Sequence, residues 1–409
     1  MEKLFQSEQE LHPRKAELAQ YLRGLAENKN KQLASRHFTD KNIGSAAGIG
    51  SKKVCEQWRT NSAILIAGKN SHLETFEWVK SIHNKGSLAL LTQWPNTDRQ
   101  WIEALVSKLN NEGIPYGLRL CHHPLTGPSE GTLISSVDKS LCRLVLLEGY
   151  LRPPDFVSNI DLPLAAVLVS HDQANIWSST NCKLFILQGD APGAKLHRSS
   201  SQMIELIGRH SLNGKFWGAT DVLTPFDAED CLRRGADFLL LDGLCEWVSD
   251  NAWSESLRSE LRNIKDSQIQ LLPDPDYFDL GTQSACLVLD RERAFRIRKL
   301  GDCSGENIEK QFLELLEIEG LKIDDMISCL TQGRAVHFAH HFSQSNRSDW
   351  NRKDWQLILR AYFLESQLKP AYVKVDPTVP RLFHWLGDFQ NDNWSVSLVI
   401  ENFIQAIQR

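Results

Sequence analysis

Between residues 61 and 250, short apolar runs alternate with longer amphipathic stretches along the chain. Each run is short enough for a strand and apolar enough to be covered on both faces, as parallel strands are. The eight runs are 63–67, 87–91, 117–121, 142–147, 164–169, 183–188, 215–219 and 237–241. Eight repeats of strand and helix predict an α/β protein with a closed (β/α)8 barrel, a TIM barrel, rather than an open sheet.

Two of the intervening stretches carry clear helix signals. Residues 98–111 repeat their apolar side chains on one helical face, which is the pattern of a helix packed against a core. Thr224 precedes Pro225 and is followed three residues later by Asp227. This order predicts an N-cap, a proline at the first helical position and a capping box.

The chain divides into three predicted zones. Residues 1–60 form a polar N-terminal extension with one amphipathic helical stretch, and residues 61–250 form the barrel. Residues 251–409 are richer in tryptophan and charge. We expect them to form a mostly helical subdomain with a segment that returns to the barrel.

Composition narrows the classes of partner and compartment. A net charge of -5 argues against nucleic acid as a partner, because neutralising phosphates needs a clustered basic surface. The nine cysteines include no C-x-x-C pair, which is typical of reduced thiols in a cytosol. Residues 1–23 lack the apolar core of a signal peptide, and no apolar run is long enough to cross a bilayer. We therefore expect a cytoplasmic protein with neither nucleic-acid nor membrane partners.

A barrel places its chemistry at the carboxyl ends of the strands, and phosphate is commonly held after strands seven and eight. The candidate positions are therefore Ala67 and Gly68, residues 119–122, residues 188–195, residues 219–221, and Asp242 with Gly243.

Several segments keep a fixed order along the chain, from residues 115–124 through 234–240 and 276–281 to Val288 and 296–300. In this order the segments resemble the PfaD-type enoyl reductases of polyunsaturated fatty acid and polyketide synthases, which are relatives of the nitronate monooxygenases. The best single match to that family is the segment at residues 276–281, Asp-Tyr-Phe-Asp-Leu-Gly. Residues 355–363 and 398–407 look like the C-terminal helices of that family.

The resemblance implies a function. Such proteins hold FMN at the barrel mouth and pass hydride from NADPH to an enoyl thioester on an acyl carrier protein. The implied partners are acyl carrier protein or synthase subunits, and a homodimer remains among the alternatives. His122 and His197 become the candidate catalytic residues, with no metal expected. The implied cofactor-binding residues are Ala67, Gly68, Arg119, Gln188, Gly193, Lys195, Ala219, Thr220, Asp221 and Gly243.

The sequence departs from the family at the cofactor. Arg119 stands where the family has an asparagine near the flavin ring, and Ala194 stands where it has a histidine after strand six. Asp221 interrupts the glycine-rich loop after strand seven, and Asp242 replaces the glycine that begins the loop after strand eight.

These departures oppose phosphate binding. Glycines let backbone N–H groups approach an anion closely and adopt positive φ, whereas Thr220, Val222 and Leu223 add Cβ atoms. Asp221 and Asp242 bring negative charge to the place where the phosphate would lie. Like charges about 4 Å apart repel by about 4 kcal/mol at an effective dielectric of about 20. The sequence thus disfavours the family's FMN pose, although Lys195, Arg119 or Arg198 would offset part of the charge.

The two most informative candidates each have two interpretations. Arg119 either grips a phosphate, a carboxylate or the phosphopantetheine arm of a carrier protein, or forms a structural salt bridge with Asp190, Asp221 or Asp242. His122 is either a proton donor at the mouth or a hydrogen-bonded packing residue.

Two metal interpretations have less support. His337, His340 and His341 have helical spacing, but no further ligand is indicated and a solvated cluster is the default. A metal-assisted hydrolase using Asp221, Asp242 and His122 is a distant alternative. Two hypotheses of different class therefore remain: an FMN-dependent enoyl reductase, and a flavin-free, non-catalytic barrel that assists a carrier-protein-dependent synthase.

Overall fold

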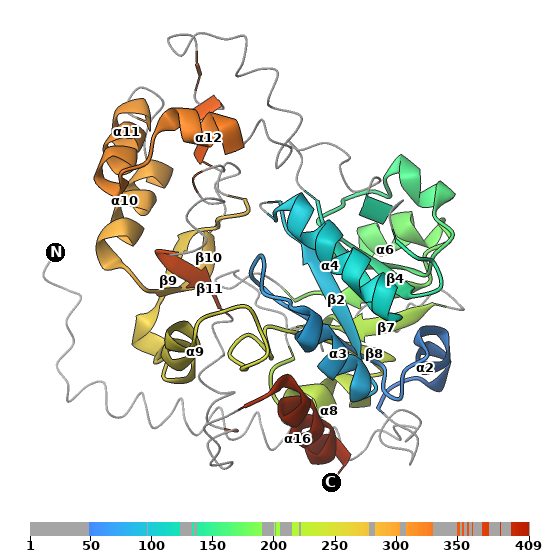
Figure 1. Ribbon diagram of the computed structural model, residues 1–409. Coiled ribbons are helices and arrows are strands. Elements are labelled where there is room, and N and C mark those ends of the chain that lie inside the picture. Colours follow the sequence, from blue (N-terminus) through green and yellow to red (C-terminus); the bar gives the residue numbers. More distant parts are fainter. Residues whose placement is uncertain are drawn as a thin grey trace, which may run out of the picture. The chain divides into compact units, whose positions relative to one another are not determined.

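Eight parallel strands close into a barrel in sequence order, with β1 paired to both β2 and β8 (Figure 1). The computed structural model describes residues 49–95, 97–122, 133–134, 137–189, 200, 202–204, 215–220, 222–277, 283–302, 308–329, 350–351, 354–355, 358–359, 362, 370–375, 385 and 394–408. The strands are β1 Ile64–Ala67, β2 Leu88–Gln93, β3 Tyr116–Cys121, β4 Cys142–Glu148, β5 Leu164–Leu168, β6 Leu184–Leu187, β7 Phe216–Ala219 and β8 Phe238–Asp242. Each lies on one of the eight predicted runs, so the barrel prediction is confirmed.

The strands alternate their side chains between the lumen and the outer helices, as the pleat requires. Leucines at alternate positions of β2 and β4, together with Leu65 of β1, belong to one buried lumen cluster. Trp58 of α2 (Lys52–Trp58) joins that cluster and packs edge-on against Phe238, with ring centroids 5.4 Å apart. Since Phe238 is the first residue of β8, α2 covers the lumen at the amino ends of the strands.

The outer helices begin where the sequence predicts. Asp98 caps α4 by accepting from the backbone N–H of Gln100, and Thr224 with Asp227 forms a complete capping box at α8. No helix among the described residues combines the length and apolar character of a bilayer span. The elements around the barrel are α3 Phe76–Asn84, α4 Arg99–Glu112, η1 Asp155–Asn159, α6 His171–Ser178 and α8 Pro225–Arg233.

The helix α16 (Val396–Gln408), near the end of the chain, returns to the barrel. It lies beside α3 and α8 (Figure 1), and Val399, Ile400 and Phe403 enter the buried layer between strands and helices. Because α3 follows β1 and α8 follows β7, α16 covers the position that a helix directly after β8 would otherwise cover.

The region after the barrel contains a small sheet as well as the expected helices. Its strands are antiparallel in the order β11-β10-β9, and β10 supplies the central pairing. Sequence analysis predicted mostly helix here and missed this sheet. Its strands are short, and β11 is separated from β9 and β10 by a long stretch of chain. The elements are α9 Glu255–Arg262, η2 Asp266–Gln268, β9 Ile269–Pro273, β10 Gln283–Val288, α10 Arg291–Asp302, α11 Ile308–Glu319, α12 Ile323–Cys329 and β11 Tyr372–Lys374.

Candidate functional site at the barrel mouth

The last lumen layer before the mouth is polar. Thr92 follows Leu88 and Leu90 on the lumen side of β2, and Asp242 follows Leu240 on β8. Thr92 is in register with Arg119 of β3, and Ala67 of β1 is in register with Asp242. Apolar layers below therefore give way to a buried layer of hydroxyl, guanidinium and carboxylate groups.

Arg119 lies at the centre of this layer and binds two carboxylates. Its Nη1 and Nη2 donate to the two Oδ atoms of Asp242, each at 3.0 Å, and its Nε donates to Oε2 of Glu148 at 2.6 Å. All three guanidinium nitrogens are thus engaged. Burial alone would lower the pKa of Arg119, but Asp242 and Glu148 outweigh burial and hold the pKa well above its usual value.

This arrangement contains the contact of one of the two interpretations of Arg119, the structural salt bridge. The expected salt bridge with Asp242 is present, and Glu148 at the end of β4 is a second partner that sequence analysis missed. Asp190 and Asp221, the other predicted partners, lie outside the described residues.

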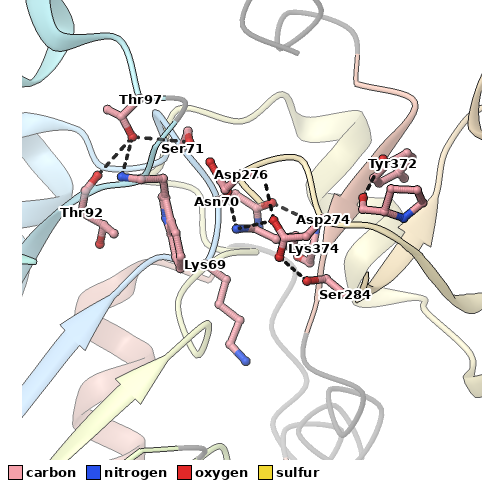
Figure 2. Close-up of polar contacts among 12 residues, drawn as sticks. Lys69, Asn70, Ser71, Thr92, Thr97, Asp274, Asp276, Ser284, Tyr372 and Lys374 are labelled. Carbon is pink, nitrogen blue, oxygen red and sulfur yellow. Dashed lines mark hydrogen bonds and ion pairs between the residues drawn. The ribbon is translucent and has the colours of Figure 1, made fainter. Parts of the chain in front are cut away.

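A second buried cation, Lys374 of β11, shares an aromatic neighbour with Arg119. Its ammonium forms ion pairs with Asp276 and, at 3.8 Å, with Asp274 (Figure 2). The ammonium also lies 3.7 Å from the ring centroid of Trp94, while the guanidinium carbon of Arg119 lies 5.0 Å from it. Burial lowers the pKa of Lys374, but the two aspartates reverse this and raise it. One indole therefore contacts a cation from the barrel and a cation from the small sheet.

Asn70, in the loop after β1, joins these parts. Its Nδ2 donates to the carbonyl of Lys374 at 2.9 Å, and its Oδ1 accepts from the N–H of Lys374 at 3.0 Å (Figure 2). Its Nδ2 also donates to Oε1 of Glu246 at 3.0 Å, and the same oxygen accepts from the N–H of Lys69 at 2.6 Å. Glu246 thus connects the loop after β8 with the loop after β1.

Two buried carboxyl groups at the mouth have strongly raised pKa values. Burial raises the pKa of Glu246 to about 8 and that of Glu74 to about 7. Glu74 accepts from the N–H of Thr92 at 3.3 Å through Oε1, and the positive charge of Arg119 lowers its pKa only in part. Glu74 therefore titrates near neutral pH, with burial as the main cause.

His122, the first catalytic candidate, directly follows β3. Its backbone N–H donates to the carbonyl of Glu148 at 2.8 Å, and its ring stacks on Tyr150 with centroids 4.3 Å apart. Tyr150 in turn packs edge-on against Phe156. The imidazole is therefore held in an aromatic stack at the rim of the mouth.

The remaining predicted residues divide into two groups. Ala67, Gly68, Arg119, Gln188, Ala219, Thr220 and Gly243 all lie at the carboxyl ends of barrel strands or directly after them. Four others lie outside the described residues: Gly193, Lys195, His197 and Asp221. The histidines His337, His340 and His341 also lie outside them. No cluster of metal-ligating side chains occurs among the residues that the structure describes.

The described mouth does not fit the FMN that the resemblance implies. A flavin phosphate needs free backbone N–H groups and positive charge. Here the Glu246 carboxyl accepts the Lys69 N–H, Asp242 ends β8, and Arg119 has its nitrogens committed to carboxylates. At α8, the Asp227 carboxylate accepts from the N–H of Thr224 at 3.1 Å. Carboxyl groups of the chain itself thus accept the hydrogen bonds of these donor groups.

Comparison with known proteins identifies the fold. No protein-family model and no curated protein matches the sequence. Among solved structures, the enoyl reductase domain of MlnA from the macrolactin biosynthesis cluster of Bacillus amyloliquefaciens is 16% identical, with a TM-score of 0.68 over 88% of this chain and 97% of that one. FabK from Thermotoga maritima is 11% identical, with a TM-score of 0.56 over 87% and 96%.

The chain shares this barrel fold. Nitroalkane oxidase from Streptomyces ansochromogenes also matches, at 11% identity and a TM-score of 0.50 over 87% of this chain and 97% of that one. These three structures bear out the resemblance to enoyl reductase and nitronate monooxygenase-like barrels at the level of the fold. Identities this low do not carry the chemistry across, so the function depends on the residues at the mouth.

Several of those residues were missed by sequence analysis. Glu74, Trp94, Glu246 and Lys374 are distant in the sequence and belong to no recognised motif. The signal that existed was weak: Lys374 interrupts the apolar run 371–375, and a lysine in a buried strand requires an acidic partner. Its partners Asp274 and Asp276 lie about a hundred residues earlier, beyond the reach of any local pattern.

Proposed function

We propose that this protein is a flavin-free, non-catalytic homologue of enoyl reductase barrels and acts as an assembly partner of a carrier-protein-dependent synthase. The observation that carries the proposal is the buried bridge from Arg119 to Asp242 and Glu148 across the mouth. In this position the bridge takes the place of the cofactor-binding surface that the resemblance implies.

Opening the mouth for a nucleotide is energetically unfavourable. Separating Arg119 from its partners leaves charges buried without compensation, and breaking a buried pair in this way typically costs about 3–5 kcal/mol. The phosphate would then meet the Asp242 carboxylate at the end of β8, which adds repulsion. Binding FMN must overcome both effects.

The choice of partner rests on the likeness to the MlnA domain. That protein belongs to a macrolactin biosynthesis cluster, and its fold matches over 88% of this chain. The shared fold over most of both chains supports a partner of the same kind for this barrel. We therefore propose an acyl carrier protein, or a synthase subunit that carries one, as the partner.

The test combines a spectrum with a binding measurement. Freshly purified protein should be colourless, should not quench the fluorescence of added FMN, and should not oxidise NADPH with crotonyl thioesters. It should nevertheless bind the phosphopantetheinylated carrier protein encoded beside it, measured by calorimetry. A yellow protein with stoichiometric FMN would overturn the proposal, as would failure to bind any carrier protein or synthase subunit from its own gene neighbourhood.

A second candidate function is FMN- and NADPH-dependent reduction of carrier-bound enoyl thioesters. It is favoured by the position of His122 directly after β3, where the resemblance implies a proton donor. In that case purified protein turns over crotonyl thioester with NADPH, and His122→Ala lowers kcat while FMN remains bound. His122→Gln serves as the matched variant that keeps ring-sized bulk without an imidazole.

A further inference from the structure

The helices α10 and α11 lie side by side and run in opposite directions (Figure 1). Arg293, near the start of α10, forms an ion pair with Glu319 at the end of α11, with Nε 2.8 Å from Oε1. The end of α10 and the start of α11 are in turn joined by the short stretch 303–307. Both helices place side chains in the same buried cluster, so their other sides face outward together.

The outer side of α10 is basic around an exposed aromatic ring. Phe295 is 58% exposed, and the ammonium of Lys299 lies 4.7 Å from its ring centroid. Glu292 is exposed as well and pairs with Arg296. The exposed cations of α10 are Arg291, Arg298 and Lys299. An apolar side chain among cations is typical of a protein-binding surface that takes an acidic partner.

The outer side of α11 is acidic around an exposed aliphatic side chain. Ile318 is 57% exposed. In the part of the chain that the structure describes, neither Arg298 nor Glu314 takes part in the ion pairs of these helices. The exposed acids of α11 are Glu309, Glu314 and Glu317, with Lys310 beside them. The outer surface of the helix pair thus combines exposed apolar side chains with charges of both signs.

We propose that this surface joins two copies of the chain in a symmetric dimer, with α10 of each copy against α11 of the other. A two-fold axis that runs between the helices and parallel to them produces this arrangement. A second copy fits both helices at once, whereas an acidic partner would meet like charge on α11 and a basic partner would meet like charge on α10. The inference goes beyond the proposed function and does not depend on it.

The ion pair between Arg293 and Glu319 indicates which charges meet. The helices run in opposite directions and each rises about 1.5 Å per residue, so each step forward along α10 corresponds to a step backward along α11. Arg298 therefore lies level with Glu314. A two-fold axis parallel to the helices leaves these levels unchanged between copies. Arg298 of each copy thus meets Glu314 of the other.

The exposed apolar side chains meet by the same count. Phe295 lies level with Glu317, next to Ile318, so the ring of one copy packs against Ile318 of the other. Burying these side chains favours association, while the opposite charges determine which helices face each other. Salt screens exposed charges but not apolar contacts. Association should therefore weaken at high salt without being lost.

Sedimentation equilibrium of the full chain measures this association. The natural protein should show a monomer–dimer equilibrium that depends on concentration. Arg298→Glu and Glu314→Arg each place like charges against each other at two symmetric contacts, so each should weaken dimerisation by about tenfold or more. Mixing the two variants restores opposite charges at both contacts, and a heterodimer with an affinity close to that of the natural dimer should form.

The mixture also checks folding, because a misfolded variant would not be rescued by the other. Phe295→Ala removes the aromatic contact and should weaken the natural dimer. Glu112→Arg, an exposed substitution on α4, is the matched control and should leave the dissociation constant unchanged. The proposal fails if the natural protein stays monomeric at every concentration, if the single charge variants dimerise like the natural protein, or if their mixture stays monomeric.

Discussion

Arg119 on β3 and Asp242 on β8 face each other across the barrel mouth, with two parallel N–O distances of 3.0 Å. The two strands are not neighbours, because β1 and β2 lie between them in the barrel. The pair therefore crosses the opening rather than following the wall. A guanidinium and a carboxylate thus meet at the carboxyl ends of the strands, where barrels of this fold hold their ligands.

The bridge should contribute strongly to stability. Arg119→Met keeps the aliphatic length but leaves Asp242 and Glu148 buried without a cation. We expect it to lower the free energy of unfolding in urea by about 3–5 kcal/mol at pH 7. The control is Arg233→Met, which removes an exposed pair with Glu229 and should cost at most about 1 kcal/mol. Equal losses in the two variants would contradict a buried bridge.

Glu74 should make stability depend on pH. Its pKa is about 7 in the folded protein, against an ordinary value of 4.5. A raised carboxyl pKa stabilises fully below 4.5, and this contribution is lost as the pH rises towards 7, by about 1.4 kcal/mol per pH unit. Glu74→Gln removes the titration, so it should match the natural protein near pH 4.5 and exceed it in stability at pH 7.5.

The measurement is urea unfolding of both proteins at intervals from pH 4.5 to 7.5. The difference between them isolates Glu74 from other titrating groups such as Glu246. A constant difference across this range would show that Glu74 is already ionised in the folded protein.

The barrel was predictable because its determinants are local. Each strand is a short apolar run, and Thr224 with Asp227 marks the start of α8 within four residues. Burial on both faces makes parallel strands visible in sequence. The same reasoning placed Arg119 in a buried strand and inferred its need for an acidic partner.

The mouth was less predictable because its contacts join distant segments. Asn70 and Lys374 are separated by 304 positions, and Lys69 and Glu246 by 177. No periodicity links such residues, and their side chains meet only after barrel and small sheet have formed. Glu148 illustrates the same limit, since it ends an apolar run and looks like an ordinary solvated residue in sequence.

The capping box of α8 provides a test of a locally encoded contact. The Thr224 side chain accepts from the N–H of Asp227 at 3.2 Å, and Asp227 accepts from the N–H of Thr224. Thr224→Ala should lower the free energy of unfolding by about 1 kcal/mol. Thr224→Ser retains the hydroxyl and should cost much less. Similar losses for both would indicate that the methyl group, rather than the cap, is responsible.

Gly218 on β7 should be intolerant of any side chain. A Cβ at this position would lie 2.3 Å from the ring of Phe238, which is fully buried and packed against Trp58. Overpacking a core in this way typically costs about 1–3 kcal/mol, so Gly218→Ala should be destabilised by that amount in urea unfolding. The additional substitution Phe238→Leu makes room for the methyl group.

The two changes should therefore be less than additive. Phe238→Leu alone leaves a void beneath Trp58 and is destabilising, whereas the Gly218→Ala methyl fills part of that void in the double variant. A double-mutant cycle measures this coupling directly, with an expected interaction of about 0.5–3 kcal/mol in the favourable direction. Strict additivity would mean that the ring of Phe238 moves aside freely, and that the lumen is packed less tightly than its fully buried side chains indicate.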